Sequence, residues 1–199
     1  MKEDVRKAIY WYQKAADQGF MDAQSKLAST YQTGYVGVFE PDYAKAAKWY
    51  KKAAEQGDAL SQVNLGEMYL KGEGVLKSWK RGVRWLRKAA DQRYALGELK
   101  LAETLDSTNP EEALSWYRKA AAQGRRGAYN ALAEKYYSGE GAPKDLVQAH
   151  MWYNLLFLGN GQWGVKGKEM REKIAKELTP EQLEKAEDMA IDWMEQHEQ

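Results

Sequence analysis

Tryptophan recurs at nearly constant intervals along the chain, and this recurrence constrains the fold more than any other feature. The intervals are 38, 36, 31 and 36 residues, between Trp11, Trp49, Trp85, Trp116 and Trp152. Each of these tryptophans lies in a helix-forming segment with small residues nearby, and no alternation typical of strands accompanies them. Such a period is typical of stacked helix pairs. We therefore expect all five indole rings to be buried as anchors of the repeats.

A second segment repeats between the tryptophans. It follows Gly19, Gly57, Arg93 and Gly124, and small or apolar residues occupy the positions 4, 8, 9 and 12 residues further on. These spacings keep one stripe on one face of a helix. We call this segment helix A and the tryptophan segment helix B. Helix B is expected to begin at a capping side chain, which is Asp42, Ser78, Asn109 or Asp145 in successive repeats.

The two segments together predict an all-α fold, a right-handed α-α superhelix (solenoid) of antiparallel helix pairs with a C-terminal pair of capping helices. The expected divisions of this single domain are 1–20 (helix B alone), 21–57, 58–93, a shortened repeat at 94–124, 125–160 and the capping helices at 161–199. Thr179-Pro180 is expected to open the last helix. Arg93 stands where the other repeats carry glycine. Because a positive φ costs a non-glycine residue roughly 1 kcal/mol or more, we expect the backbone to relax there.

Two stretches carry a resemblance to a known repeat. The pattern Leu65-Gly66-x-x-Tyr69-x-x-Gly72-x-Gly74-Val75, and the segment from Lys48 to Gly57 in the preceding unit, resemble the Sel-1-like repeat, a relative of the tetratricopeptide repeat. The resemblance extends from residue 1 to about residue 160. It implies a bacterial interaction scaffold, since such arrays mostly present surfaces to partner proteins. Known roles of similar bacterial proteins are adaptors in envelope processes, host-interaction factors and immunity partners that mask a toxin.

Composition excludes several function classes. The net charge is +1, which offers no basic excess for a nucleic-acid backbone. No apolar run approaches the roughly 20 residues that cross a bilayer, so we expect a soluble protein. Cysteine is absent, which removes disulfides and thiolate sites and is compatible with either cytoplasm or periplasm. No signal peptide follows Met1, so the compartment, including export, stays open.

Catalytic chemistry is not indicated. The two histidines, His150 and His197, have neither metal-ligand spacing nor a neighbouring nucleophile, and we expect both to be structural or solvated. The glycine cluster at 159–167 lacks the ending of a phosphate loop and is expected to connect to the capping helices. We therefore predict no catalytic residue, no metal, no cofactor and no enzymatic activity.

The resemblance implies that helix A lines a concave groove, whose exposed positions would contact a partner. Ten residues after Gly57, Arg93 and Gly124, each helix A carries a glutamate. These residues, Glu67, Glu103 and Glu134, would form an acidic ladder. An apolar strip beside it would suit apolar side chains of a protein or peptide partner that is also basic. The expected groove residues are Leu60, Val63, Glu67, Leu70, Leu96, Leu99, Glu103, Asn130, Glu134 and Tyr137.

Several alternatives stay open at this stage. The leucines could pack against neighbouring helices while the glutamates are merely solvated, or the groove could hold a small ligand such as a cell-wall fragment. The lysines three residues after a tryptophan could meet an acidic partner or a lipid surface, or could simply complement the helix dipole. Because the first repeat has only helix B, Ile9 and Trp11 are expected to be exposed enough for a homodimer to form through this face.

Overall fold

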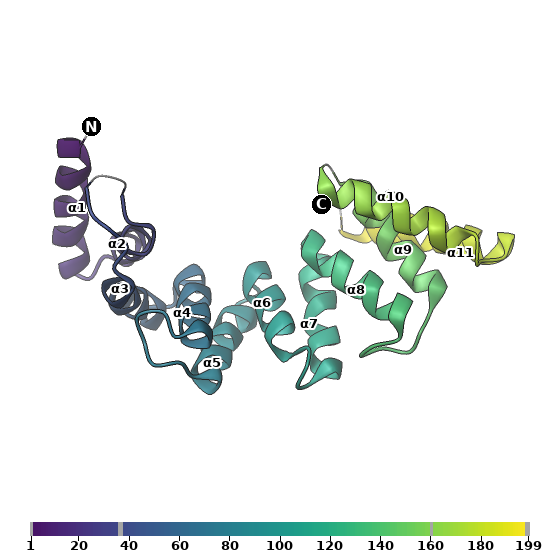
Figure 1. Ribbon diagram of the computed structural model, residues 1–199, viewed down its shortest axis with the longest axis horizontal. Coiled ribbons are helices and arrows are strands. Elements are labelled where there is room, and N and C mark those ends of the chain that lie inside the picture. The colour runs from purple at the N-terminus through teal and green to yellow at the C-terminus, as the bar shows by residue number, and fades with distance from the viewer. Residues whose placement is uncertain (1, 36–37, 160, 198–199) are drawn as a thin grey trace. The chain divides into compact units, whose positions relative to one another are not determined.

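The computed structural model describes residues 2–35, 38–159 and 161–197, and these form helices joined by turns and short loops. An isolated bridge between Tyr35 and Phe39 is the one extended pairing there, and those residues form no strand. The chain divides into two compact units, Met1–Lys100 and Leu101–Gln199. Figure 1 labels the helices of both units. The predicted all-α class of stacked helices is confirmed.

Unit 1 holds five helices and the start of a sixth, and each of the first four packs against the next. They are α1 (Lys2–Asp17), α2 (Met21–Thr33), α3 (Tyr43–Glu55), α4 (Ala59–Lys71), α5 (Trp79–Asp91) and α6 (Ala95–Leu105). Helix A of the sequence corresponds to α2, α4 and α6. Helix B corresponds to α1, α3 and α5.

Unit 2 continues the same order from the end of α6. Its further helices are α7 (Pro110–Ala122), α8 (Arg126–Ser138), α9 (Leu146–Phe157), α10 (Gln162–Ala175) and α11 (Pro180–His197). Here α7 and α9 are helix B and α8 is helix A. The capping helices α10 and α11 both pack against α9.

Side chains at the helix starts explain where the helices begin. Asp42 accepts a hydrogen bond from the backbone N–H of Lys45, and Asn109 accepts one from Glu112. Ser78 and Asp145 cap α5 and α9 in the same way. These bonds satisfy backbone donors that have no partner within the helix. The predicted starts of the four helix B segments are therefore confirmed.

Two glycines allow a close contact in unit 1, between α4 and α5. A methyl group on Gly82 would lie 2.6 Å from the Leu70 side chain and 3.0 Å from the carbonyl oxygen of Gly66. A methyl group on Gly66 would lie 2.9 Å from Leu86 and 3.2 Å from the carbonyl oxygen of Gly82. The two helices therefore touch through reciprocal glycines, because any larger side chain would push them apart.

A repeated glutamine pair crosslinks neighbouring helices inside unit 1. The amide of Gln24 donates to the carbonyl of Ala16 at 3.1 Å, and Gln56 donates to Gln24 at 2.7 Å. One repeat later, the amide of Gln62 donates to Ala54 at 3.1 Å and receives a bond from Gln92 at 2.8 Å. Gln24 and Gln62 are buried. These bonds satisfy polar groups that would otherwise be costly in the core.

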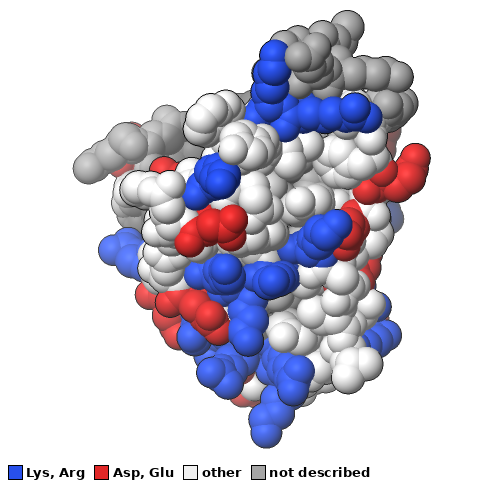
Figure 2. All heavy atoms as spheres, turned by 90° about the vertical axis from the view of Figure 1, so that its left-hand side faces the viewer, with Lys and Arg blue, Asp and Glu red and all other residues white. Residues whose placement is uncertain are grey.

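The repeating tryptophan is buried at four of its five positions. Trp49, Trp85, Trp116 and Trp152 are buried as predicted. The prediction of a buried anchor is wrong for Trp11, which is 68% exposed, as expected for a first repeat that has only helix B. Trp49 and Trp85 share one cluster with residues of α2 and α4, whereas α2 is the only described helix with which α1 makes extensive contact. Figure 2 shows the face of unit 1 that carries α1, where uncharged side chains lie between lysines and arginines.

Arg93 keeps the backbone conformation of the glycines that it replaces. Its φ is 59°, and it is the only non-glycine residue with a positive φ in the described ranges. Gly19, Gly57 and Gly124 have φ values of 93°, 102° and 75°. The expected local relaxation is therefore wrong. The backbone N–H of Arg93 donates to the carbonyl of Ala90 at 2.8 Å, so the turn closes as it does at Gly57 and Gly124 despite the strain.

Candidate functional site

The helix-A surface was the predicted site, and its residues differ in how open they are. Leu60 on α4 is 42% exposed, and Leu70 and Leu96 are half-buried. Val63 and Leu99 are buried, so the expectation that they line an open apolar strip is wrong. For Val63 the reason is that α4 packs against both α3 and α5, which gives it a wider buried arc than a single stripe. Leu60 is therefore the open apolar side chain of this surface in unit 1.

Two glutamates of the expected acidic ladder have a lysine of the same unit beside them. In unit 1, Lys100 lies 3.6 Å from Glu67. In unit 2, Lys166 pairs with Glu134. Glu103 is exposed. Ion pairs at such partly or fully exposed positions contribute at most about 1 kcal/mol, so a basic partner could displace the lysines, but the surface is less acidic than its sequence suggests.

A hollow of about 250 Å³ lies on the helix-A surface of unit 1. Its walls come from α2 and α4, and the buried Tyr50 of α3 lies at its base. Burial raises the pKa of the Tyr50 phenol, whose hydroxyl donates to Gln32 at 2.8 Å. The hollow thus has one apolar edge and a polar interior, and its other lining side chains are Asp22, Ser25, Lys26, Ser29, Asp58, Leu60 and Asn64.

The polar groups of this hollow are held in place by local bonds. Asp58 caps α4 by accepting the backbone N–H of Ser61 at 3.0 Å. The Ser61 hydroxyl lies 3.1 Å from that of Ser25, which ties α4 to α2. Asp22 is exposed on the first turn of α2, where the helix dipole favours a negative charge. A fixed set of donors and acceptors around an apolar side chain suits an extended peptide segment.

The helix-A surface of unit 2 contains a smaller hollow, of about 190 Å³, beside Lys135. The Lys135 ammonium is buried, pairs with Asp106 and lies 5.7 Å from the centre of the Tyr117 ring. Burial, and next the charge of Asp106, raise the pKa of Tyr117. The predicted residue Glu134 lines this hollow.

The other two predicted residues of α8, Asn130 and Tyr137, are half-buried. The Lys144 and Lys173 ammonium groups lie 5.9 and 5.1 Å from the centre of the Tyr137 ring. The aromatic face of Tyr137 therefore already holds cations of its own chain.

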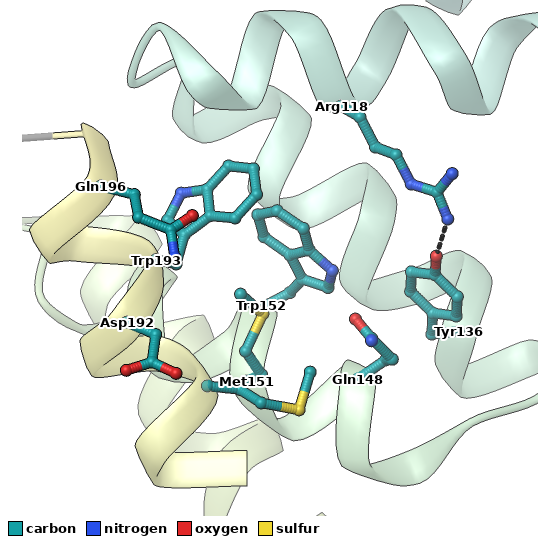
Figure 3. A pocket seen from close by; sticks show the side chains of 9 residues that line it. Arg118, Tyr136, Gln148, Met151, Trp152, Asp192, Trp193 and Gln196 are labelled. Carbon is teal, nitrogen blue, oxygen red and sulfur yellow. Dashed lines mark hydrogen bonds between the residues drawn. The ribbon is translucent and has the colours of Figure 1, made fainter.

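A further pocket in unit 2 was not predicted from the sequence. It measures about 290 Å³ and lies where α9 meets α11, beside α7 and α8. Figure 3 shows the indoles of Trp152 and Trp193 facing each other, with Asp192 and Gln196 on the α11 side. The two rings meet edge to face with centroids 4.7 Å apart. Arg118 donates to the hydroxyl of Tyr136 on the opposite side.

Acid–base chemistry is poorly supported in that pocket. Asp192 is its one carboxylate among the described residues, whereas glycoside cleavage uses a pair. The nearby His150 is buried in α9, and burial, together with the charge of Arg171, lowers its pKa to about 4. It is therefore neutral at pH 7, and the expectation of a structural histidine holds. The signal that could have revealed this pocket is Trp193, which shares an apolar face with Ala186 and Ala190.

Three of the four lysines that follow a tryptophan by three residues lie over the indole of their own helix, whereas Lys14 lies over the ring of Tyr10. The ammonium groups of Lys52, Lys88 and Lys119 are 4.3, 4.5 and 3.6 Å from the ring centres of Trp49, Trp85 and Trp116. Such cation–π contacts contribute about 0.5–1 kcal/mol at exposed sites. These three lysines therefore have an intramolecular partner in addition to the helix dipole.

The described part of the chain has no cluster of three or more histidine, cysteine, aspartate or glutamate side chains suited to a metal ion. None of its described helices combines the length and the apolar character needed to cross a membrane.

Comparison with known families gives five matches along the chain. The family model of the Sel1 repeat matches residues 1–20, 22–58, 59–94, 93–124 and 127–156. The chain belongs to the Sel1 repeat family. Proteins built from Sel1 repeats generally mediate protein–protein interactions, and the fold is typically a non-enzymatic scaffold. No curated protein matches the chain.

Solved Sel1 repeat structures resemble the chain closely. A protective antigen present in uropathogenic Escherichia coli strains, which has an SLR fold, is 36% identical with a TM-score of 0.81. That match covers 95% of this chain and 41% of the antigen, so the chain spans about two fifths of that relative. A Sel1 repeat protein from Oxalobacter formigenes is 28% identical with a TM-score of 0.67, covering 98% of this chain and 96% of the other.

A more distant structure shares the fold alone. An immunity protein from Pseudomonas aeruginosa is 22% identical with a TM-score of 0.53, covering 93% of this chain and 73% of that protein. All three relatives are bacterial proteins. They support the helical-repeat solenoid class, and they do not identify the surface that this Sel1 repeat protein uses.

Proposed function

We propose that the protein is a non-enzymatic interaction scaffold that binds an extended segment of a partner protein on its helix-A surface. The observation that carries this proposal is the hollow of unit 1, where the exposed Leu60 borders fixed polar groups of α2 and α4. A partner segment with an apolar side chain would cover Leu60. Its basic side chains and backbone donors would meet Asp22 and the Ser29 hydroxyl.

The contacts within the hollow favour a peptide over a small ligand. The space of about 250 Å³ is open along the surface and suits one or two side chains, whereas drug-sized ligands occupy about 300–1,000 Å³. Polar atoms on both α2 and α4 would fix the direction of an extended backbone. Leu60 would contribute most through burial, at about 25 cal/mol per Å² of apolar surface covered.

Site-specific photocrosslinking in the native bacterium tests this proposal. A photoreactive phenylalanine analogue at Leu60 or at Ser29 is expected to crosslink a protein partner. The matched control carries the same analogue at Lys48, an exposed residue of helix B in the same unit. A further variant, Leu60→Asp, is expected to abolish the crosslink formed from position 29. Crosslinks from position 48 alone would contradict the proposal.

Two alternatives remain from the sequence. A small ligand such as a cell-wall fragment would find an aromatic site in the pocket of Trp152 and Trp193, which is supported by its two adjacent indoles. Calorimetric titration with muropeptides, using Trp193→Ala as the variant, would measure that binding. An immunity-type inhibitor of a toxin is also compatible with a scaffold, and a crosslinked partner that proves to be a toxin would identify that role.

A further inference from the structure

Two large apolar side chains are exposed to solvent at the start of α5, away from the helix-A surface. Leu76, in the turn before the helix, is 85% exposed, and Trp79, its first residue, is 49% exposed. Trp79 lies six positions before Trp85 and therefore outside the repeating tryptophan pattern. Packing of the repeat does not explain either side chain.

Positively charged side chains follow Leu76 and Trp79 in the N-terminal half of α5, where positive charge destabilises the helix. Lys80 and Arg84 are exposed one helical turn apart, and Lys88 follows one turn later. The first turn of α5 contains no acidic residue. A positive charge there opposes the helix dipole, and like charges four residues apart repel each other. Helix stability therefore gives no reason for a lysine at position 80 or an arginine at position 84.

Lys80 and Arg84 differ from the neighbouring cations in their contacts within the chain. Lys88 lies over the ring of Trp85, and the guanidinium of Arg81 lies 5.7 Å from the ring centre of Tyr69. In the ranges that the structure describes, neither Lys80 nor Arg84 has an ion pair or a ring contact. Their charges are therefore available to a group outside the chain.

A hollow of about 360 Å³ lies among these side chains, with Trp79 and Val83 as its apolar part. Its charged lining consists of the four cations Lys80, Arg84, Arg87 and Lys88 and the one carboxylate Asp91, so positive charge predominates. Tryptophan and arginine are the residues most enriched at the energetic centres of protein interfaces. A hollow of this size accepts a side chain, which a flat lipid surface does not require. The combination therefore favours a protein partner over a membrane.

We propose that this Trp79 face, defined by Leu76, Trp79, Lys80, Val83 and Arg84, docks an acidic segment of a partner protein. An apolar side chain of the segment covers Trp79, and its carboxylates pair with Lys80 and Arg84. The face belongs to helix B and to the turn before it, so it is a second interaction surface that is independent of the hollow beside Leu60.

A fluorescein-labelled peptide with leucines flanked by glutamates is the probe, and its anisotropy reports binding to the full chain. Trp79→Ala and Arg84→Glu are each expected to weaken binding at least about tenfold, as for an interface hot spot. Lys48→Glu is the matched control, because Lys48 precedes Trp49 as Arg84 precedes Trp85 and the charge change is the same. It is expected to change affinity less than about twofold. Circular dichroism verifies that every variant is folded.

Further variants and measurements distinguish this proposal from alternative explanations. Leu60→Asp is expected to leave peptide binding unchanged, so failure of the helix-A proposal would not be mistaken for failure of this one. Equal losses from Arg84→Glu and Lys48→Glu would show general charge attraction and overturn the proposal. Absence of peptide binding would also overturn it, as would binding to phosphatidylglycerol vesicles in place of the peptide.

Discussion

Arg93 provides a quantitative test of the repeat, because it bears a strain that the equivalent glycines avoid. A left-handed conformation costs an L-residue roughly 1–2 kcal/mol. Glycine, in turn, costs roughly 0.5–1 kcal/mol more conformational entropy on folding than other residues, because its backbone is more flexible in the unfolded state. The difference predicts that Arg93→Gly raises the free energy of unfolding by about 0.5–1 kcal/mol. For a chain of this length each kcal/mol corresponds to a Tm shift of about 2–4 °C.

Two further variants separate backbone strain from side-chain effects. Arg93→Ala removes the guanidinium but keeps the strain, so its stability should match the wild type. Gly124→Ala introduces the strain at φ 75°, where a methyl group would meet no atom within 4 Å, and should cost about 0.5–1 kcal/mol. Urea unfolding followed by both circular dichroism and tryptophan fluorescence measures these changes and tests for two-state behaviour. The reasoning is refuted if Arg93→Gly is no more stable than Arg93→Ala.

Three other predictions concern packing and titration. Trp116→Ala should cost about 3–5 kcal/mol, and the exposed Trp11→Ala less than about 1 kcal/mol, in the same urea assay; equal losses would contradict the burial pattern. Gly82→Ala should cost about 1–3 kcal/mol by separating α4 from α5, and an unchanged midpoint would exclude that close contact. His150 has a folded-state pKa lowered from 6.5 to about 4, so the unfolded chain binds its proton first and stability falls as the pH drops below 6.5. Between pH 6.5 and pH 5 the loss is up to about 2 kcal/mol, and His150→Gln should remove this part of the pH dependence.

The fold follows from the sequence wherever a side chain acts locally. The capping residues Asp42 and Asn109 start their helices as expected, because a side-chain oxygen there satisfies a nearby backbone N–H. Trp49 and Trp116 are buried because Ala-rich neighbours let adjacent helices approach. Burial of Trp11 was predicted from the same pattern and is wrong, since a periodic position becomes buried only when a second helix covers it.

The site is less predictable because the exposure of a side chain depends on how many other helices pack against its own helix. Spacing alone placed Leu60, Val63 and Leu99 on one open strip, yet Val63 and Leu99 are buried. The pocket beside Trp193 needs the cap to fold back on α9, a contact distant in sequence. Lysine contacts with tryptophan rings, such as Lys119 over Trp116, were also missed, although residues three apart share a helix face.

Solvent exposure of the individual tryptophans tests the central claim most directly, that the repeat position buries its ring wherever neighbouring helices cover it and leaves it exposed where they do not. The measurement is fluorine NMR of protein labelled with 5-fluorotryptophan, with resonances assigned by single Trp→Phe variants and a soluble paramagnetic agent added. The signals of Trp49, Trp85, Trp116 and Trp152 should stay narrow, and those of Trp11 and Trp79 should broaden. Broadening of any of the first four as strong as that of Trp11 would contradict the account.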